Sequence, residues 1–156
     1  SGCILLSIAK KFPNHEYIGI DKSKIAIKTA NKNKKLLGCR NVEFFNHDIF
    51  MYNQPKVDLI LCNPPYLANH EIQNLEQSIK QNEPMSALTD FKNGISFYKY
   101  LISNFNNLIK TNGIMLLEIP FSSVTKDIIS INKNFNSNKS VLYKDLEGKN
   151  RVIKIY

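Results

Sequence analysis

The residues of this chain best suited to chemistry are four in a row, Asn63-Pro64-Pro65-Tyr66, directly after the apolar run 57–62. Each proline fixes its own φ, has no N–H group and favours extended geometry in the residue before it. These residues therefore predict a rigid turn with unpaired carbonyl groups at the carboxyl end of a strand, where open α/β sheets bind ligands. The Asn63 amide and a bare carbonyl held there suit recognition of a planar NH₂ group.

Two carboxylates follow other predicted strands. Asp21 lies nineteen positions after Gly2, close to the spacing at which a Rossmann-type fold places an acid on ribose hydroxyls. Asp48 precedes Ile49, so its carboxylate suits an adenine amino group while the apolar neighbour covers the ring. A helix-capping role for Asp21 and a turn-forming role for Asp48 remain the alternatives. Ser1 and Gly2 precede a predicted helix and fit the end of a glycine-rich nucleotide loop.

Helices and strands are predicted to alternate along the chain. Ser23 is the predicted N-cap of the second helix and Gly38 its stop. The order predicts a doubly wound, mostly parallel α/β sheet closed by a C-terminal antiparallel pair. The polar segment 67–94 is predicted to cap a site. Helices are expected over 5–12, within 23–38, over 97–109 with a stop at 112–113, and from 124; strands are expected over 16–21, 42–45, 57–62, 114–119, 140–145 and 151–156.

Composition bounds the class of protein. With 156 residues, 43% hydrophobic and 22% charged, one globular domain is expected, and no apolar run is long enough to cross a bilayer. The net charge of +8 includes only two arginines, Arg40 and Arg151, and scattered lysines, so we favour a compositional origin over nucleic-acid binding. Three cysteines without a C-x-x-C pair indicate a reduced compartment, and no metal site is expected.

Residues 58–66 resemble the fourth motif of S-adenosylmethionine-dependent methyltransferases that act on planar amide or amine nitrogens. These enzymes include adenine-N6 DNA methyltransferases, guanine-N2 ribosomal RNA methyltransferases and the glutamine-N5 methyltransferases of peptide chain release factors. Other segments resemble only the last group: E-P-x-x-A-L at 83–88, D-G-L-x-F-Y at 93–98, L-E-I-G at 117–120 and D-L-x-G-x-x-R-V at 145–152.

This resemblance implies a Rossmann-like class I methyltransferase domain over 1–156, with its first strand and the family's N-terminal helical substrate domain missing. It implies that S-adenosylmethionine is held by a set of residues in which Asn63 also faces the substrate: Ser1, Gly2, Asp21, Asp48, Ile49 and Asn63. Asn63, Pro64, Pro65 and Tyr66 would hold a glutamine of the Gly-Gly-Gln loop of a release factor. The chain departs from the family at His47, at Phe91-Lys92 and at Pro120, where small residues or glycines are usual.

The expected reaction transfers a methyl group to the glutamine amide nitrogen N5, with Asn63, Pro64 and Tyr66 as the catalytic residues and no metal. The protein is expected to be a monomer of the cytoplasm or of an organelle, with a release factor as partner, no membrane contact and no direct nucleic-acid substrate. An adenine-N6 or guanine-N2 methyltransferase, which the positive charge favours, is the first alternative. A binding module without turnover is the second.

Overall fold

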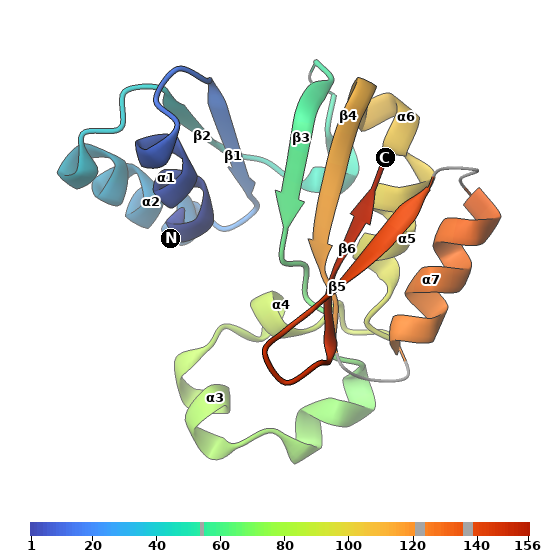
Figure 1. Ribbon diagram of the computed structural model, residues 1–156. Coiled ribbons are helices and arrows are strands. Elements are labelled where there is room, and N and C mark those ends of the chain that lie inside the picture. Colours follow the sequence, from blue (N-terminus) through green and yellow to red (C-terminus); the bar gives the residue numbers. More distant parts are fainter. Residues whose placement is uncertain (54, 121–123, 136–138) are drawn as a thin grey trace. The chain divides into compact units, whose positions relative to one another are not determined.

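The computed structural model describes residues 1–53, 55–120, 124–135 and 139–156 (Figure 1). The chain forms two compact units, residues 1–54 and 55–156, here the N-terminal unit and the C-terminal unit. Each unit has its own sheet, of two and four strands respectively. Within the described ranges, no helix combines the length and the apolar composition needed to cross a bilayer.

The N-terminal unit packs two helices beside a parallel strand pair in which Asp21 is aligned with Asn46. The second helix begins where predicted, because the Ser23 hydroxyl accepts a hydrogen bond from the Ala26 N–H at 3.2 Å. It ends at Gly38, whose φ of 67° is left-handed, the usual glycine stop. The elements are α1 (Cys3–Lys11), β1 (Tyr17–Asp21), α2 (Lys24–Leu37), β2 (Val42–Asn46) and the 3-10 turn η1 (Ile49–Met51).

The C-terminal unit is a sheet of order β3-β4-β6-β5 with helices α5 and α7 packed against each other (Figure 1). Alternate residues of the central strands, Met115 and Leu117 on one and Ile153 and Ile155 on the other, are fully buried, as expected for one covered sheet face. The elements are β3 (Val57–Cys62), η2 (Asn69–Asn74), α3 (Gln77–Asn82), α4 (Met85–Leu88), α5 (Ser96–Ser103), α6 (Phe105–Leu108), β4 (Ile109–Glu118), α7 (Val124–Phe135), β5 (Ser140–Lys144) and β6 (Asn150–Ile155).

Strand directions place three strand ends at one edge of this sheet. β3 and β4 are parallel, and β6 is antiparallel to both β4 and β5. Consequently β3, β4 and β5 all point the same way, and Cys62, Glu118 and Lys144 end at a common edge (Figure 1). The Asn63–Tyr66 turn leaves the sheet at this carboxyl edge, as the sequence predicts.

The alternating α/β order and the C-terminal antiparallel pair are confirmed, but one boundary prediction was wrong. The helix predicted over 97–109 stops at Ser103, a short α6 follows, and β4 already begins at Ile109. Asn112-Gly113, predicted as a helix stop, instead lies in an irregularity of β4: Val57 pairs with Ile109, but Leu59 pairs with Ile114. Asn112 has a φ of 66° there, so the turn-forming pair bends a strand.

Candidate functional site

The Asn63–Tyr66 turn combines an exposed amide with a buried proline. Asn63 is exposed, Pro64 is buried, and Tyr66 is half-buried. Just before the turn, burial raises the pKa of the Cys62 thiol to about 12. The thiol therefore stays protonated near neutral pH and is a poor nucleophile.

Three successive backbone amides after the turn are each fixed by a hydrogen bond. The Leu67 N–H donates to the Leu88 carbonyl at 2.9 Å, and the Asn69 N–H donates to the Lys92 carbonyl at 2.8 Å. Between them, the Ala68 N–H donates to the Glu71 carboxylate at 2.8 Å. Two of these three acceptors belong to the segment 88–96, which we call the support loop.

Gly94 of the support loop lies directly against the turn. Its φ is +77°, and a Cβ added there would lie 2.1 Å from the Tyr66 carbonyl oxygen and 2.8 Å from its carbon. Any larger residue would push the Tyr66 peptide aside. Sequence patterns marked this glycine as part of a family-like segment but did not indicate its contact with the turn.

Tyr98, which follows the support loop in α5, ties that helix to the end of β4. Its hydroxyl donates to the Glu118 carbonyl at 2.7 Å, and its ring is fully buried. Burial, followed by the nearby groups Cys62, Tyr66 and Glu118, raises the pKa of Tyr98 well above its usual value. The phenol therefore stays neutral and keeps its role as a donor at the carboxyl edge.

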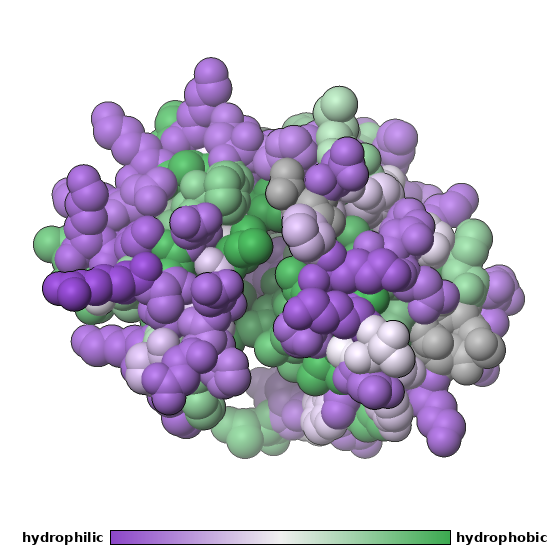
Figure 2. Space-filling view, turned by 90° about the horizontal axis from the view of Figure 1, so that it is seen from above, coloured by the Kyte–Doolittle hydropathy of each residue, from purple (hydrophilic) through white to green (hydrophobic). Residues whose placement is uncertain are grey.

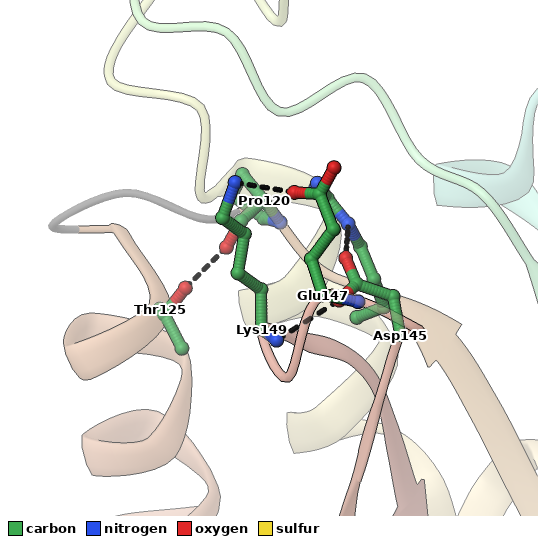
Figure 3. A network of polar contacts seen from close by, with 6 residues as sticks. Pro120, Thr125, Asp145, Glu147 and Lys149 are labelled. Carbon is green, nitrogen blue, oxygen red and sulfur yellow. Dashed lines mark hydrogen bonds and ion pairs between the residues drawn. The ribbon is translucent and has the colours of Figure 1, made fainter.

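The turn between β5 and β6 projects from the same edge and is closed by one carboxylate. Asp145 accepts from the Lys149 N–H at 2.9 Å, the Glu147 N–H at 3.0 Å and the Arg151 Nε at 3.0 Å. The Lys149 ammonium pairs with Glu147 at 2.6 Å (Figure 3). The D-L-x-G-x-x-R-V segment therefore forms the turn between β5 and β6, and this network holds that turn together.

Figure 3 also shows a hydrogen bond beside this turn, from the Thr125 hydroxyl to the Pro120 carbonyl. Pro120 stands where the family motif has glycine. The Ile119 N–H, directly before Pro120, donates to the Arg151 carbonyl at 2.8 Å. The hydrogen bonds between β4 and β6 therefore continue one residue beyond Glu118.

In the N-terminal unit, the predicted loop residues Ser1 and Gly2 are held in place by hydrogen bonds. The Asn33 side chain donates to the Ser1 carbonyl at 3.0 Å, and the Gly2 carbonyl accepts from the Leu6 N–H at 2.9 Å. Gly2 has a φ of +74°, and a Cβ there would lie 2.7 Å from the Phe44 ring. Gly2 therefore satisfies two requirements of a glycine in such a loop, positive φ and close packing.

Phe44 also covers a second glycine that sequence patterns did not indicate. A Cβ at Gly19 would lie 2.4 Å from its ring. Because Gly19 pairs with Phe44 across the two strands, the ring lies over the strand that leads to Asp21. The signal that could have identified it is a lone glycine inside an apolar strand.

The predicted ribose and adenine residues lie at the carboxyl ends of β1 and β2. Asp21 is exposed, and its Oδ1 accepts from the Ser23 N–H at 2.8 Å. Asp48 is half-buried, and its Oδ1 accepts from the Phe50 N–H at 3.0 Å. Each carboxylate thus forms a local turn through Oδ1, and no side chain or amide of the described residues is seen to bond to its Oδ2. The half-buried Ile49 follows Asp48 in η1.

Asn46 and His47 connect these two strand ends. The Asn46 side chain donates to the Asp21 and Lys22 carbonyls at 3.0 and 2.8 Å, and the His47 N–H donates to the Asp21 carbonyl at 3.1 Å. The His47 ring nitrogen lies 3.1 Å from the Met51 carbonyl. The residue that departs from the family pattern therefore closes the loop after β2.

A cavity of about 620 Å³ lies at the opposite edge of the C-terminal sheet, away from the Asn63 turn. Lys56, Lys110, Lys154 and Tyr156 are among the residues that line it. Lys110 is paired with Asp58 at 2.9 Å, and both side chains are largely exposed. Figure 2, seen from above, shows hydrophilic residues over much of that face. Lys56 is exposed, and the half-buried Lys154 lies with its ammonium 5.0 Å from the centre of the Tyr156 ring, so each lysine is exposed or already has a partner and the cavity carries no proposal.

Across the described ranges, no group of three or more His, Cys, Asp or Glu side chains is placed to hold a metal ion. The residues predicted for the cofactor fall in the N-terminal unit except Asn63, and those predicted for the substrate fall in the C-terminal unit.

A family profile described as a methyltransferase domain matches residues 1–154. The chain belongs to the methyltransferase domain family. This methyltransferase domain is 36% identical to the release factor glutamine methyltransferase of Thermodesulfovibrio yellowstonii, over 98% of the chain and 55% of the relative. It is 34% identical to the protein of the same name from Fusobacterium nucleatum, over 98% of the chain and 44% of the relative. The chain thus spans about half the length of these curated relatives.

Solved structures support the fold. A methyltransferase from Pyrococcus furiosus matches with a TM-score of 0.67 at 14% identity, over 98% of this chain and 68% of that chain. A putative methyltransferase from Streptococcus mutans, solved in complex with SAH, matches with a TM-score of 0.60 at 13% identity, over 90% and 74%. At these identities the likeness concerns the fold alone, and it confirms the class I methyltransferase fold predicted from the sequence.

Proposed function

We propose that this methyltransferase domain transfers a methyl group from S-adenosylmethionine to the side-chain amide nitrogen N5 of a glutamine in the Gly-Gly-Gln loop of a peptide chain release factor. The observation that carries the proposal is the Asn63–Tyr66 turn at the carboxyl end of β3, where the support loop accepts hydrogen bonds from the Leu67 and Asn69 amides that follow the turn. The names of the relatives at 34 and 36% identity point to the same substrate.

The residues present fit the cofactor. Gly2 opens α1 with a positive φ and no room for a side chain, and the first N–H groups of a helix have no acceptor within the helix, so those of α1 would bind an acceptor atom of the cofactor. Asp21 would accept from the ribose through Oδ2, and Asp48 with Ile49 would bind the adenine. When bound, S-adenosylmethionine supplies a methyl group on a positively charged sulfur.

The chemical difficulty lies in the acceptor, because the lone pair of an amide nitrogen is delocalised into its carbonyl group. In the proposed mechanism, the Asn63 side-chain oxygen and the Pro64 carbonyl accept the two amide hydrogens, and Tyr66 packs against the amide plane. The lone pair is then aimed at the methyl group. Holding reactants in a near-attack geometry can supply roughly 7–11 kcal/mol of the barrier, and fixed dipoles add to it.

This mechanism uses neither a general base before the transfer nor a covalent enzyme intermediate. The methylated nitrogen can lose its extra proton to solvent after the transfer. The protonated Cys62 thiol beside the turn is consistent with this assignment, because burial raises its pKa to about 12.

The decisive test is Asn63→Ala in the full-length protein, incubated with a release factor and labelled S-adenosylmethionine. We expect loss of label on the loop glutamine, while the dissociation constant for the cofactor changes little. Asn74→Ala, an exposed asparagine of η2, serves as the matched control and should retain normal turnover. Near-normal turnover of Asn63→Ala would overturn the assignment.

The same labelling experiment with DNA and RNA in place of the release factor tests the first alternative, which the net charge of +8 favours. Label on nucleic acid but not on the release factor would replace the proposed substrate. Cofactor binding without label on any of the three would favour a binding module.

A further inference from the structure

The shape of the support loop is set by two of its own side chains. The Asp90 Oδ1 accepts from the Lys92 and Gly94 N–H groups, both at 2.9 Å, and its Oδ2 accepts from the Ser96 N–H at 3.0 Å. The Thr89 hydroxyl, almost completely buried, accepts from the Phe91 N–H at 3.0 Å. A single carboxylate therefore accepts hydrogen bonds from three amides of the support loop, which runs from the last residue of α4 to the first residue of α5.

Two of the three residues that donate to Asp90 also contact residues 66–69, which are Tyr66 of the turn and the residues directly after it. The Lys92 carbonyl accepts from the Asn69 N–H, and Gly94 lies against the Tyr66 carbonyl. Leu88, two residues before Asp90, accepts from the Leu67 N–H. Loss of the carboxylate would therefore loosen the contacts that Gly94 and Lys92 make with Tyr66 and Asn69, and it would free the chain next to Leu88, the acceptor of the Leu67 N–H.

We infer that Asp90 is a positioning residue for the methyl acceptor: through Lys92 and Gly94 it fixes the Tyr66 peptide and, with it, the orientation of Asn63 and the Pro64 carbonyl. This inference rests on the proposed function. The two prolines transmit the constraint, because each has a fixed φ and the segment between Asn63 and Tyr66 has few rotatable bonds. Asp90 does not touch the substrate.

Asp145 provides a matched comparison in the same unit. Its carboxylate also accepts from two backbone N–H groups in a turn, together with the Arg151 side chain. The bonds that the Asp145 carboxylate accepts come from residues 147–151, and residues 63–69 are not among their donors. Loss of Asp145 therefore removes a similar set of bonds without disturbing the turn after β3.

The experiment compares Asp90→Ala, Asp90→Asn and Asp145→Ala in the full-length protein. With release factor and S-adenosylmethionine both saturating, we expect kcat to fall at least about tenfold in Asp90→Ala, since misplacement by 1 Å can cost about 100-fold. The KM for the cofactor should stay within about twofold. Asp90→Asn keeps one acceptor oxygen for Lys92 and Gly94 and should recover part of the activity. Asp145→Ala should stay within about threefold of wild type.

Amide hydrogen exchange gives a readout that is independent of activity. In Asp90→Ala, the amides of Leu67 and Asn69 should exchange faster than in wild type, whereas in Asp145→Ala they should be unchanged. A kcat loss no larger than that of Asp145→Ala, or unchanged exchange at both amides, would overturn the inference. If wild-type protein labels no release factor, the proposed function fails, while the exchange comparison still decides the structural role of Asp90.

Discussion

The two units hold their predicted site residues in different ways. In the N-terminal unit, Asp21 and Asp48 each accept a hydrogen bond from the residue two positions further on. In the C-terminal unit, the Asn63–Tyr66 turn is braced by a loop that lies more than twenty residues later in the chain. The orientation of each carboxylate in the first arrangement depends on a neighbour two positions away. The second makes the acceptor geometry depend on distant residues, and that difference can be tested by substitution.

The largest effect is expected from Gly94→Ala. The new Cβ would lie 2.1 Å from the Tyr66 carbonyl oxygen, at a φ of +77°, and strain and overpacking together should cost about 3 kcal/mol or more of the free energy of unfolding. Methylation should be lost as the Tyr66 peptide moves. Urea unfolding and turnover measure both effects.

Gly148→Ala is the control for this substitution. Gly148 also has a positive φ, +80°, but a Cβ there would meet nothing within 4 Å, so only the backbone strain of about 1–2 kcal/mol is expected. Equal destabilisation by the two substitutions would mean that contact with the turn contributes nothing.

Gly2→Ala should have the next largest effect, and it should act on cofactor affinity. Its Cβ would lie 2.7 Å from the Phe44 ring at a φ of +74°, which predicts a loss of about 2–3 kcal/mol in the free energy of unfolding. Gly38→Ala, with a φ of +67° and no atom within 4 Å, should lose only about 1–2 kcal/mol.

Calorimetric titration with S-adenosylmethionine separates these two variants, because only Gly2→Ala should weaken binding. Adding Phe44→Leu to Gly2→Ala shortens the clashing side chain and should restore part of the stability. Unchanged cofactor affinity in Gly2→Ala would remove Gly2 from the proposed cofactor loop.

The same difference explains what the sequence could predict. Helix caps and aspartate turns depend on neighbours within a few residues, so Ser23, Gly38, Asp21 and Asp48 fall where their patterns indicate. Asn112-Gly113 has the composition of a helix stop, yet pairing of β4 with β3 overrides it, because tertiary contacts outweigh local propensity. Pairing between strands that are far apart in the chain, such as β3 and β4, cannot be predicted from a short stretch of a single sequence.

The same distinction between local patterns and distant contacts decides which residues of the candidate site could be predicted. Asn63-Pro64-Pro65-Tyr66 could be found because prolines and a polar residue after an apolar strand are a local pattern. Gly94 and Asp90 could not be assigned roles, since Gly94 contacts the Tyr66 peptide across an intervening segment and Asp90 acts on that contact only through Gly94. The later family-like segments proved to be supports around the carboxyl edge, as the bond from Tyr98 to Glu118 shows.

A smaller effect is expected when pH is lowered. Burial acts to raise the pKa of the Asp90 carboxyl, but hydrogen bonds from Ser96, Gly94 and Lys92 outweigh it and hold the pKa below its usual range. A depressed folded-state pKa contributes stability above the unfolded value of about 4, and that stability is lost as pH falls through the folded value.

Asp90→Asn should therefore be less stable than wild type at neutral pH, and the gap should narrow below about pH 4. Urea midpoints from pH 7 down to pH 2.5 measure this, roughly spanning the carboxyl range. A gap that is constant over this range would show that the ionised carboxylate is not what holds the support loop.

The smallest effect is expected from Phe91→Gly, which tests strain inside the support loop. Phe91 has a φ of 59° and is 56% exposed, and it belongs to the pair Phe91-Lys92 that departs from the glycine-rich motif which the sequence resembles. Left-handed geometry costs a non-glycine residue about 1–2 kcal/mol, and glycine loses roughly 0.5–1 kcal/mol more to chain entropy. The net result should be a gain of about 0.5–1 kcal/mol in the free energy of unfolding, measured with urea.

Asn112→Gly, with a φ of 66°, is the comparison. It should gain less, because asparagine tolerates left-handed geometry better than phenylalanine. Destabilisation by Phe91→Gly would mean that contacts of the phenylalanine ring outweigh the strain, and that the support loop is held by packing as well as by the Asp90 carboxylate.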